Sequence, residues 1–70
     1  MYVMVSVVSS NVHAVGYDPD HKDLYIEFNN GGRYVYHGVD KSVHESLMRS
    51  SSKGSFVANY LRNRYPYQKL

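Results

Sequence analysis

The sequence predicts an α+β domain: a small antiparallel sheet of about three strands, followed by two helices packed on one face of that sheet. Between residues 12 and 37, apolar and polar side chains alternate with the period of two that is typical of strands. After residue 40 the apolar spacing changes to the three and four that is typical of helices. The chain has 70 residues and no cysteine, so we treat residues 1–70 as a single domain without disulfides.

Residues 1–8 are largely apolar and predict a strand or an arm. As an extra N-terminal strand they would either extend the sheet or pair with a second copy of the chain, giving a homodimer. They have no basic region or small-residue cleavage motif, and they are too few to cross a bilayer. We therefore expect no membrane partner and, since cysteine is absent, a reducing cytoplasmic location.

The antiparallel strands are expected within residues 9–37. A first strand over residues 12–18 should end in a turn, because Pro19 fixes its backbone and Asp18 before it can accept a hydrogen bond from the turn. A second strand over residues 23–28 should bury one face, which comprises Leu24, Ile26 and Phe28.

A hairpin should join the second strand to a third strand at residues 33–37. The Asn-Asn-Gly-Gly sequence of residues 29–32 tolerates the positive φ angles that tight hairpin turns require. Tyr34 and Tyr36 share one face of the third strand, and we expect them to pack in the core. Tyr25 lies opposite the apolar face of the second strand and is expected to be the most exposed of these tyrosines.

Two helices are expected within residues 40–65. Asp40 is a suitable N-cap for the first helix, and Ser42 with Glu45 would form a capping box one step later. The amphipathic spacing of the second helix runs from residue 56 to 64, and the helix should end before Pro66.

The charge is divided unevenly along the chain, whose net charge is +2. Residues 1–35 carry −2, whereas residues 36–70 carry +4. A basic half is typical of proteins with an anionic partner, although an ordinary solvated helix face explains it equally well.

The start of the second helix is one candidate anion site. Backbone N–H groups there lack intrahelical partners, and Ser52, Lys53, Gly54 and Ser55 would add hydroxyls, a positive charge and room for close approach. Arg49 on the preceding helix would add a second charge. A plain serine N-cap followed by a glycine turn is the competing interpretation.

Exposed tyrosines beside basic residues are the other candidate site, because aromatic rings stack on the bases of single-stranded RNA. Tyr25 is the first candidate. Tyr65 and Tyr67, next to Arg64 and Lys69, are also expected to be accessible. Helix-dipole complementarity is a structural alternative for Arg62 and Arg64.

Catalysis, metal binding and cofactors are not expected. The four histidines lie on separate elements without ligand spacing, and no cysteine accompanies them. No serine lies in a nucleophile-elbow pattern, and so small a chain leaves little room for a substrate and a triad.

Several short motifs together resemble the KTSC family, which is named for a C-terminal extension of some lysyl-tRNA synthetases and includes small bacterial and phage proteins. They are Ser9-Ser10-Asn11-Val12, Val15-Gly16-Tyr17-Asp18, Leu24-x-Ile26-x-Phe28, Gly32-x-Tyr34-x-Tyr36 and Ser52-x-Gly54-x-Phe56. Asp40 departs from the pattern, which usually has proline there. The resemblance implies a fold and, through the synthetase association, suggests RNA binding.

The expected function is therefore that of a small non-catalytic binding module for RNA or another phosphate-bearing ligand. The alternative is a protein–protein interaction module, such as a phage-encoded adaptor or inhibitor, which would work through an exposed strand edge or the N-terminal arm.

Overall fold

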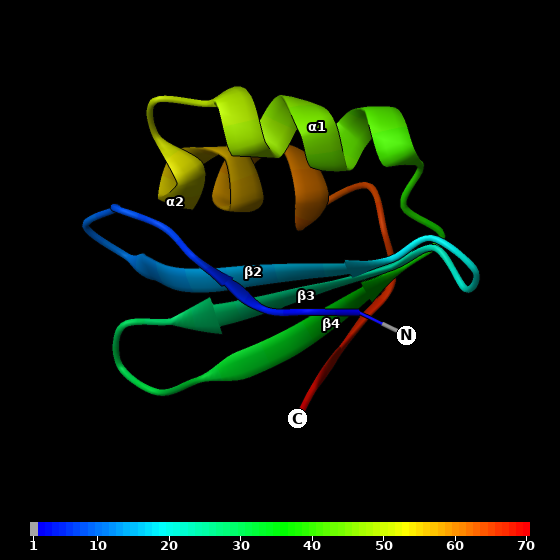
Figure 1. Cartoon of the computed structure of the whole chain (residues 1–70), viewed down its shortest axis with the longest axis horizontal. Helices are drawn as coiled ribbons and strands as arrows, with labels where there is room; N and C mark the ends of the chain where they lie inside the picture. The colour runs from blue at the N-terminus through cyan, green and yellow to red at the C-terminus, as the bar shows by residue number, and fades with distance from the viewer. Residues whose placement is uncertain (1) are drawn as a thin grey trace.

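The computed structural model describes residues 2–70 and contains one antiparallel sheet with a helical layer on one face (Figure 1). Its elements are β1 (Val5–Ser6), β2 (Val12–Asp18), β3 (Asp23–Phe28), β4 (Arg33–His37), α1 (Lys41–Arg49), α2 (Lys53–Phe56), η1 (Val57–Leu61) and β5 (Tyr67–Lys69). The α+β class and the placement of the helices on one face are confirmed.

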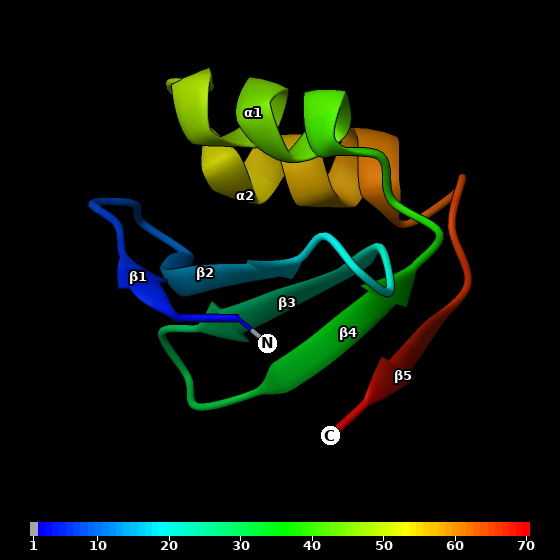
Figure 2. The same cartoon turned by 45° about the vertical axis from the view of Figure 1, so that its right-hand side comes forward.

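The sheet has five strands in the order β1-β2-β3-β4-β5, each antiparallel to its neighbours, so the expected count of about three was too low. The two outer strands have only two and three residues, too few to show an alternating pattern in the sequence. The extra N-terminal strand is confirmed, since Val5 pairs with Val15. After the helices, β5 returns along the free edge of β4 (Figure 2).

The β3–β4 hairpin has the register that the alternation predicted. Leu24 pairs with Tyr36 and Ile26 with Tyr34, so both tyrosines share the helix-facing side of the sheet with the apolar residues of β3. In the turn, Gly31 has a φ of 93°, a conformation that glycine adopts without steric cost.

The core lies between the sheet and the helices. The strands β2, β3 and β4 and the helices α1 and η1 contribute buried side chains to it, whereas α2 contributes none. Its members are Val12, Val15, Leu24, Ile26, Tyr36, Val39, Leu47, Val57 and Leu61. Burial of Leu24, Ile26 and Tyr36 is confirmed. Phe28, also expected in the core, is only half-buried, because its ring faces an open groove at the end of the sheet.

The N-terminal arm crosses the face of the sheet opposite the helices. A Cβ atom at Gly16 would lie 2.6 Å from the Sδ of Met4 and 2.8 Å from the ring of Tyr2, so glycine at this position lets the arm approach the sheet. The Tyr2 ring stacks on Tyr25, with centroids 3.9 Å apart and planes inclined by 10°. Tyr25 is consequently half-buried, not the exposed side chain expected from the sequence.

The first helix begins after Asp40, as expected, but without side-chain capping. The Asp40 carboxylate instead accepts a hydrogen bond from Lys22 Nζ at 3.2 Å. Ser42 lies inside α1, so the capping-box alternative is wrong.

The second helix begins after Ser52, within the range predicted, and changes pitch along its length. The four-residue α2 runs directly into the π-helical η1, where the Arg62 N–H donates to the Val57 carbonyl at 3.0 Å. A π turn closes its hydrogen bond over five residues, one more than an α turn. Across residues 2–70, no helix combines the length and apolar character needed to span a membrane.

Candidate binding groove

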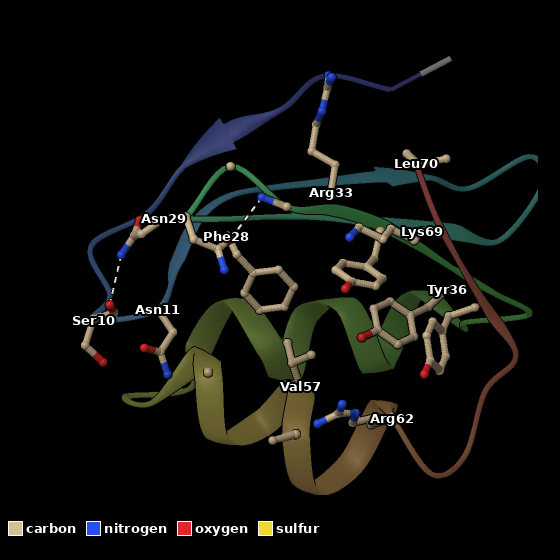
Figure 3. Close-up of a pocket in the computed structure, with 17 residues that line it drawn as sticks. Ser10, Asn11, Phe28, Asn29, Arg33, Tyr36, Val57, Arg62, Lys69 and Leu70 are labelled. Atoms are coloured by element: carbon tan, nitrogen blue, oxygen red, sulfur yellow. Dashed lines mark hydrogen bonds between the residues drawn. The ribbon is translucent and has the colours of Figure 1, made fainter.

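An open groove of about 920 Å³ lies between the α2–η1 segment and the C-terminal side of the sheet (Figure 3). Its helical wall is made by Gly54, Val57, Ala58 and Arg62. Its sheet wall is made by Phe28, Tyr34, Tyr36, Tyr67 and Lys69. The β1–β2 loop and the β3–β4 turn close one end, through Ser10, Asn11 and residues 29–33.

The sheet wall is a continuous series of aromatic rings. Phe28 meets Tyr34 edge-on at 5.7 Å, and Tyr67 lies 6.0 Å from Tyr34 and 5.3 Å from Tyr36. Tyr36 is buried beneath this series, and burial raises the pKa of its hydroxyl. Tyr67 is 44% exposed and is therefore the ring most available for stacking on a ligand.

Two cations reach the groove from opposite walls. Arg62 extends from the end of η1 and Lys69 from β5, on either side of Tyr36 (Figure 3). The positive charge of Arg62 partly opposes the burial-induced rise in the pKa of Tyr36. The Arg33 side chain points away from the groove (Figure 3). None of the lining side chains is acidic, so the side chains of the groove favour anions.

The closed end of the groove is rich in amides and is held by hydrogen bonds. Asn29 Nδ2 donates to the carbonyls of Ser9 and Ser10 at 3.2 and 2.9 Å, and the Asn29 backbone N–H donates to the Asn11 carbonyl at 2.8 Å. The Ser9 hydroxyl accepts from the backbone N–H groups of Asn11 and Val12. These contacts fix the β1–β2 loop against the hairpin turn.

The residues proposed from the sequence as an anion site are neighbours, but only Gly54 lines the groove. Lys53 Nζ donates to the Ser50 carbonyl at 2.9 Å, and the Ser52 hydroxyl donates to that of Ser55 at 2.9 Å. These polar groups therefore already have partners within the chain. Arg49 is the last residue of α1 and is exposed.

Tyr25 and Arg64 lie apart from that cluster and from each other. Tyr25 is covered by Tyr2 on the sheet face opposite the helices, whereas the Arg64 guanidinium lies 4.5 Å above the Tyr60 ring. The seven residues proposed from the sequence thus occupy three separate regions. The prediction that Tyr67 is accessible is confirmed. For Arg62 the sequence indicated only a structural role, complementing the helix dipole, because its place beside the groove depends on the path of η1.

The histidines are also dispersed. His21 Nδ1 lies 2.9 Å from an Asp18 carboxylate oxygen, and His37 bridges Asp23 at 2.9 Å and Gln68 at 3.1 Å. His44 stacks on an aromatic ring, and burial lowers its pKa. Over residues 2–70, no three His, Asp or Glu side chains gather in a way that would hold a metal ion.

Comparisons with known proteins agree on one family. The model of the KTSC domain matches residues 8–65. A protein from Tsukamurella paurometabola is 36% identical over 62 residues, covering 89% of this chain and 92% of its own length. A lysine–tRNA ligase from Nostoc sp. is 31% identical over 61 residues, covering 87% of this chain but only 11% of the ligase.

The same relationship holds in three dimensions. The crystal structure of a KTSC domain protein from Yersinia pestis has 33% sequence identity and superposes with a TM-score of 0.94, covering 100% of this chain and 99% of that one. Sequence and fold agree over almost the whole length, and the chain therefore belongs to the KTSC domain family.

Proposed function

We propose that this domain is a non-catalytic module that binds single-stranded RNA in the groove between η1 and β5. The observation that carries the proposal is the combination of an aromatic wall with two cations on opposite sides and no acidic side chain in the lining. Proteins that bind single strands combine these features, because rings stack on bases while cations neutralise the phosphates between them.

Each part of the groove has a distinct role in this proposal. Tyr67 would stack on a base, which is worth about 1–3 kcal/mol per base. Arg62 and Lys69 would contact phosphate oxygens on either side of that base. The lysine–tRNA ligase of Nostoc also supports an RNA ligand, since a domain similar to this one is part of an enzyme named for a tRNA substrate. A cytoplasmic location is part of the same proposal.

The test is fluorescence anisotropy with a labelled, mixed-sequence oligoribonucleotide at several salt concentrations. Replacing both Arg62 and Lys69 by Ala should reduce the salt slope by about 1.4, since each single-strand phosphate contact contributes about 0.7. Tyr67→Ala should weaken binding roughly 5- to 150-fold and leave the slope unchanged, because it removes stacking but no charge.

The double variant Arg49→Ala, Lys53→Ala is the matched control, because it removes the same charge outside the groove. If the groove is the site, this control keeps the parental slope. A slope reduced by the control and not by the groove variant would instead favour the helix-start anion site. If the parent binds no oligonucleotide at low salt, RNA binding is contradicted.

A protein–protein interaction module is the second candidate, and the exposed N-terminal arm favours it. Val3 is 74% exposed and Val5 50% exposed, and the latter lies on β1 at an edge of the sheet. Such an edge can pair with a strand of a partner or of a second copy of the chain. Sedimentation would detect a homodimer, and capture of a protein whose binding is insensitive to salt would favour an adaptor or inhibitor.

A further inference from the structure

The closed end of the groove carries a side-chain amide, that of Asn11, whose backbone is fixed by hydrogen bonds. Asn11 lines the groove and its side chain is exposed, while its backbone is held on both sides: its N–H donates to the Ser9 hydroxyl at 3.3 Å, and its carbonyl accepts from Asn29 at 2.8 Å. Among residues 2–70, no hydrogen bond is formed by the Asn11 side-chain amide. Its donor and acceptor are both available to a ligand.

Gly54 fixes where that amide lies. A Cβ atom at position 54 would be 2.8 Å from Asn11 Nδ2, 3.1 Å from its Cβ and 3.3 Å from its Cγ. The Asn11 side chain therefore packs against the backbone at the start of α2, and only glycine leaves room for it. This contact also joins two of the family motifs, Ser9-Ser10-Asn11-Val12 and Ser52-x-Gly54-x-Phe56.

The surroundings of the amide suit a nucleobase. Phe28 lies in the groove between Asn11 and Tyr36 (Figure 3), with its half-buried ring facing the groove. A ring of this kind supports a base from one side, and an adjacent amide presents one donor and one acceptor to the edge of that base. Asparagine pairs in this bidentate way with the N6 amino group and N7 of adenine.

We infer that Asn11, held by Gly54, determines base specificity by recognising the edge of an adenine bound next to Phe28. This inference rests on the proposed RNA-binding function and adds a specific role for the closed end of the groove. The cations at the other end contact phosphates and give affinity for any sequence, whereas the amide discriminates among bases.

The experiment compares the affinities of short oligoadenylate and oligouridylate for the parent and three variants. The parent should bind oligoadenylate about tenfold more tightly, the effect of one good bidentate pair. Asn11→Asp replaces the donor by a second acceptor and should remove that ratio. Gly54→Ala keeps the amide but displaces it, and should reduce the ratio in the same way.

Asn30→Asp is the matched control, because it makes the same chemical change at another amide of the groove, one that accepts a hydrogen bond from the Gly32 N–H. It should lower affinity for both oligonucleotides through its added negative charge and leave their ratio unchanged. Circular dichroism checks that every variant is folded.

The outcomes separate the inference from the function on which it rests. Equal binding of the two oligonucleotides by the parent, or a ratio unaffected by Asn11→Asp, would overturn base recognition and leave RNA binding intact. A ratio that Asn30→Asp also abolishes would overturn the assignment to Asn11. Failure of both oligonucleotides to bind at low salt would contradict RNA binding itself.

Discussion

Ile26 and Phe28 lie two residues apart on the same face of β3, and truncating each to alanine should have different costs. Ile26 is 1% exposed and lies between Val15 and Tyr34 on the neighbouring strands. Ile26→Ala removes three carbons, worth about 0.8 kcal/mol each in transfer free energy. The cavity left behind raises the total cost to roughly 3–4 kcal/mol.

Phe28→Ala should cost less, about 2 kcal/mol, although truncating a fully buried phenylalanine typically costs about 3–5 kcal/mol. The phenylalanine ring faces the groove, so part of its surface is never removed from water and its loss leaves no closed cavity. The order of the two costs therefore follows from the position of the helices, which cover Ile26 and leave the Phe28 ring partly open.

Thermal unfolding followed by circular dichroism measures both changes. A 70-residue domain has a free energy of unfolding of about 4–10 kcal/mol. Each kcal/mol lost lowers Tm by about 4–8 °C, so Ile26→Ala should melt at least 12 °C below the parent, by the same scaling, and Phe28→Ala roughly half as far below it. A Phe28→Ala variant that is less stable than Ile26→Ala would refute this account of the groove.

Two further predictions concern the arm and the histidines. Deleting residues 1–6 removes the stacking on Tyr25 and the β1 pairing, and should lower Tm and raise the accessibility of Tyr25 to chemical modification; unchanged melting would mean that the arm adds no stability. Carboxylate partners raise the pKa of His21 and His37, so the stability they add is present below pH ~6.5 and is lost as the pH rises through their folded-state pKa values. Burial lowers the pKa of His44, so protonation of this one side chain opposes folding as the pH falls below ~6.5. In an NMR titration His44 should have the lowest midpoint of the three, and the reverse order would contradict these assignments.

The part of the fold that could be predicted is the part with enough residues to show a period. The alternation in β3 and β4 sets both the strands and their register, and the asparagine–glycine turn sets their antiparallel pairing. The strands β1 and β5 are too short to show a pattern in the sequence. They form because β2 and β4 present edges with which they can pair. Tyr25 was misjudged for a similar reason, because the ring that covers it comes from a segment more than twenty residues away.

The groove was harder to predict than the fold because it is made by segments that meet only in three dimensions. Gly54 was selected as part of a helix start, yet the contact that requires glycine is with Asn11, more than forty residues earlier. Tyr67 and Lys69 share one side of β5, but a three-residue strand gives no sign that this side faces Arg62. Local patterns identify the residue types of the groove and leave their arrangement open.

The π turn has a consequence for chains that differ in length at this point. Each residue of an α-helix turns the chain by about 100° about the helix axis. A π turn uses one more residue for about the same rotation of the chain. Removing one residue from Val57–Leu61, with a return to α-helical pitch, would therefore leave everything after it in nearly the same orientation. The arginine would stay beside the groove although its distance in sequence from Gly54 had changed. When relatives are aligned, a difference of one residue between Gly54 and the arginine is therefore compatible with the same groove.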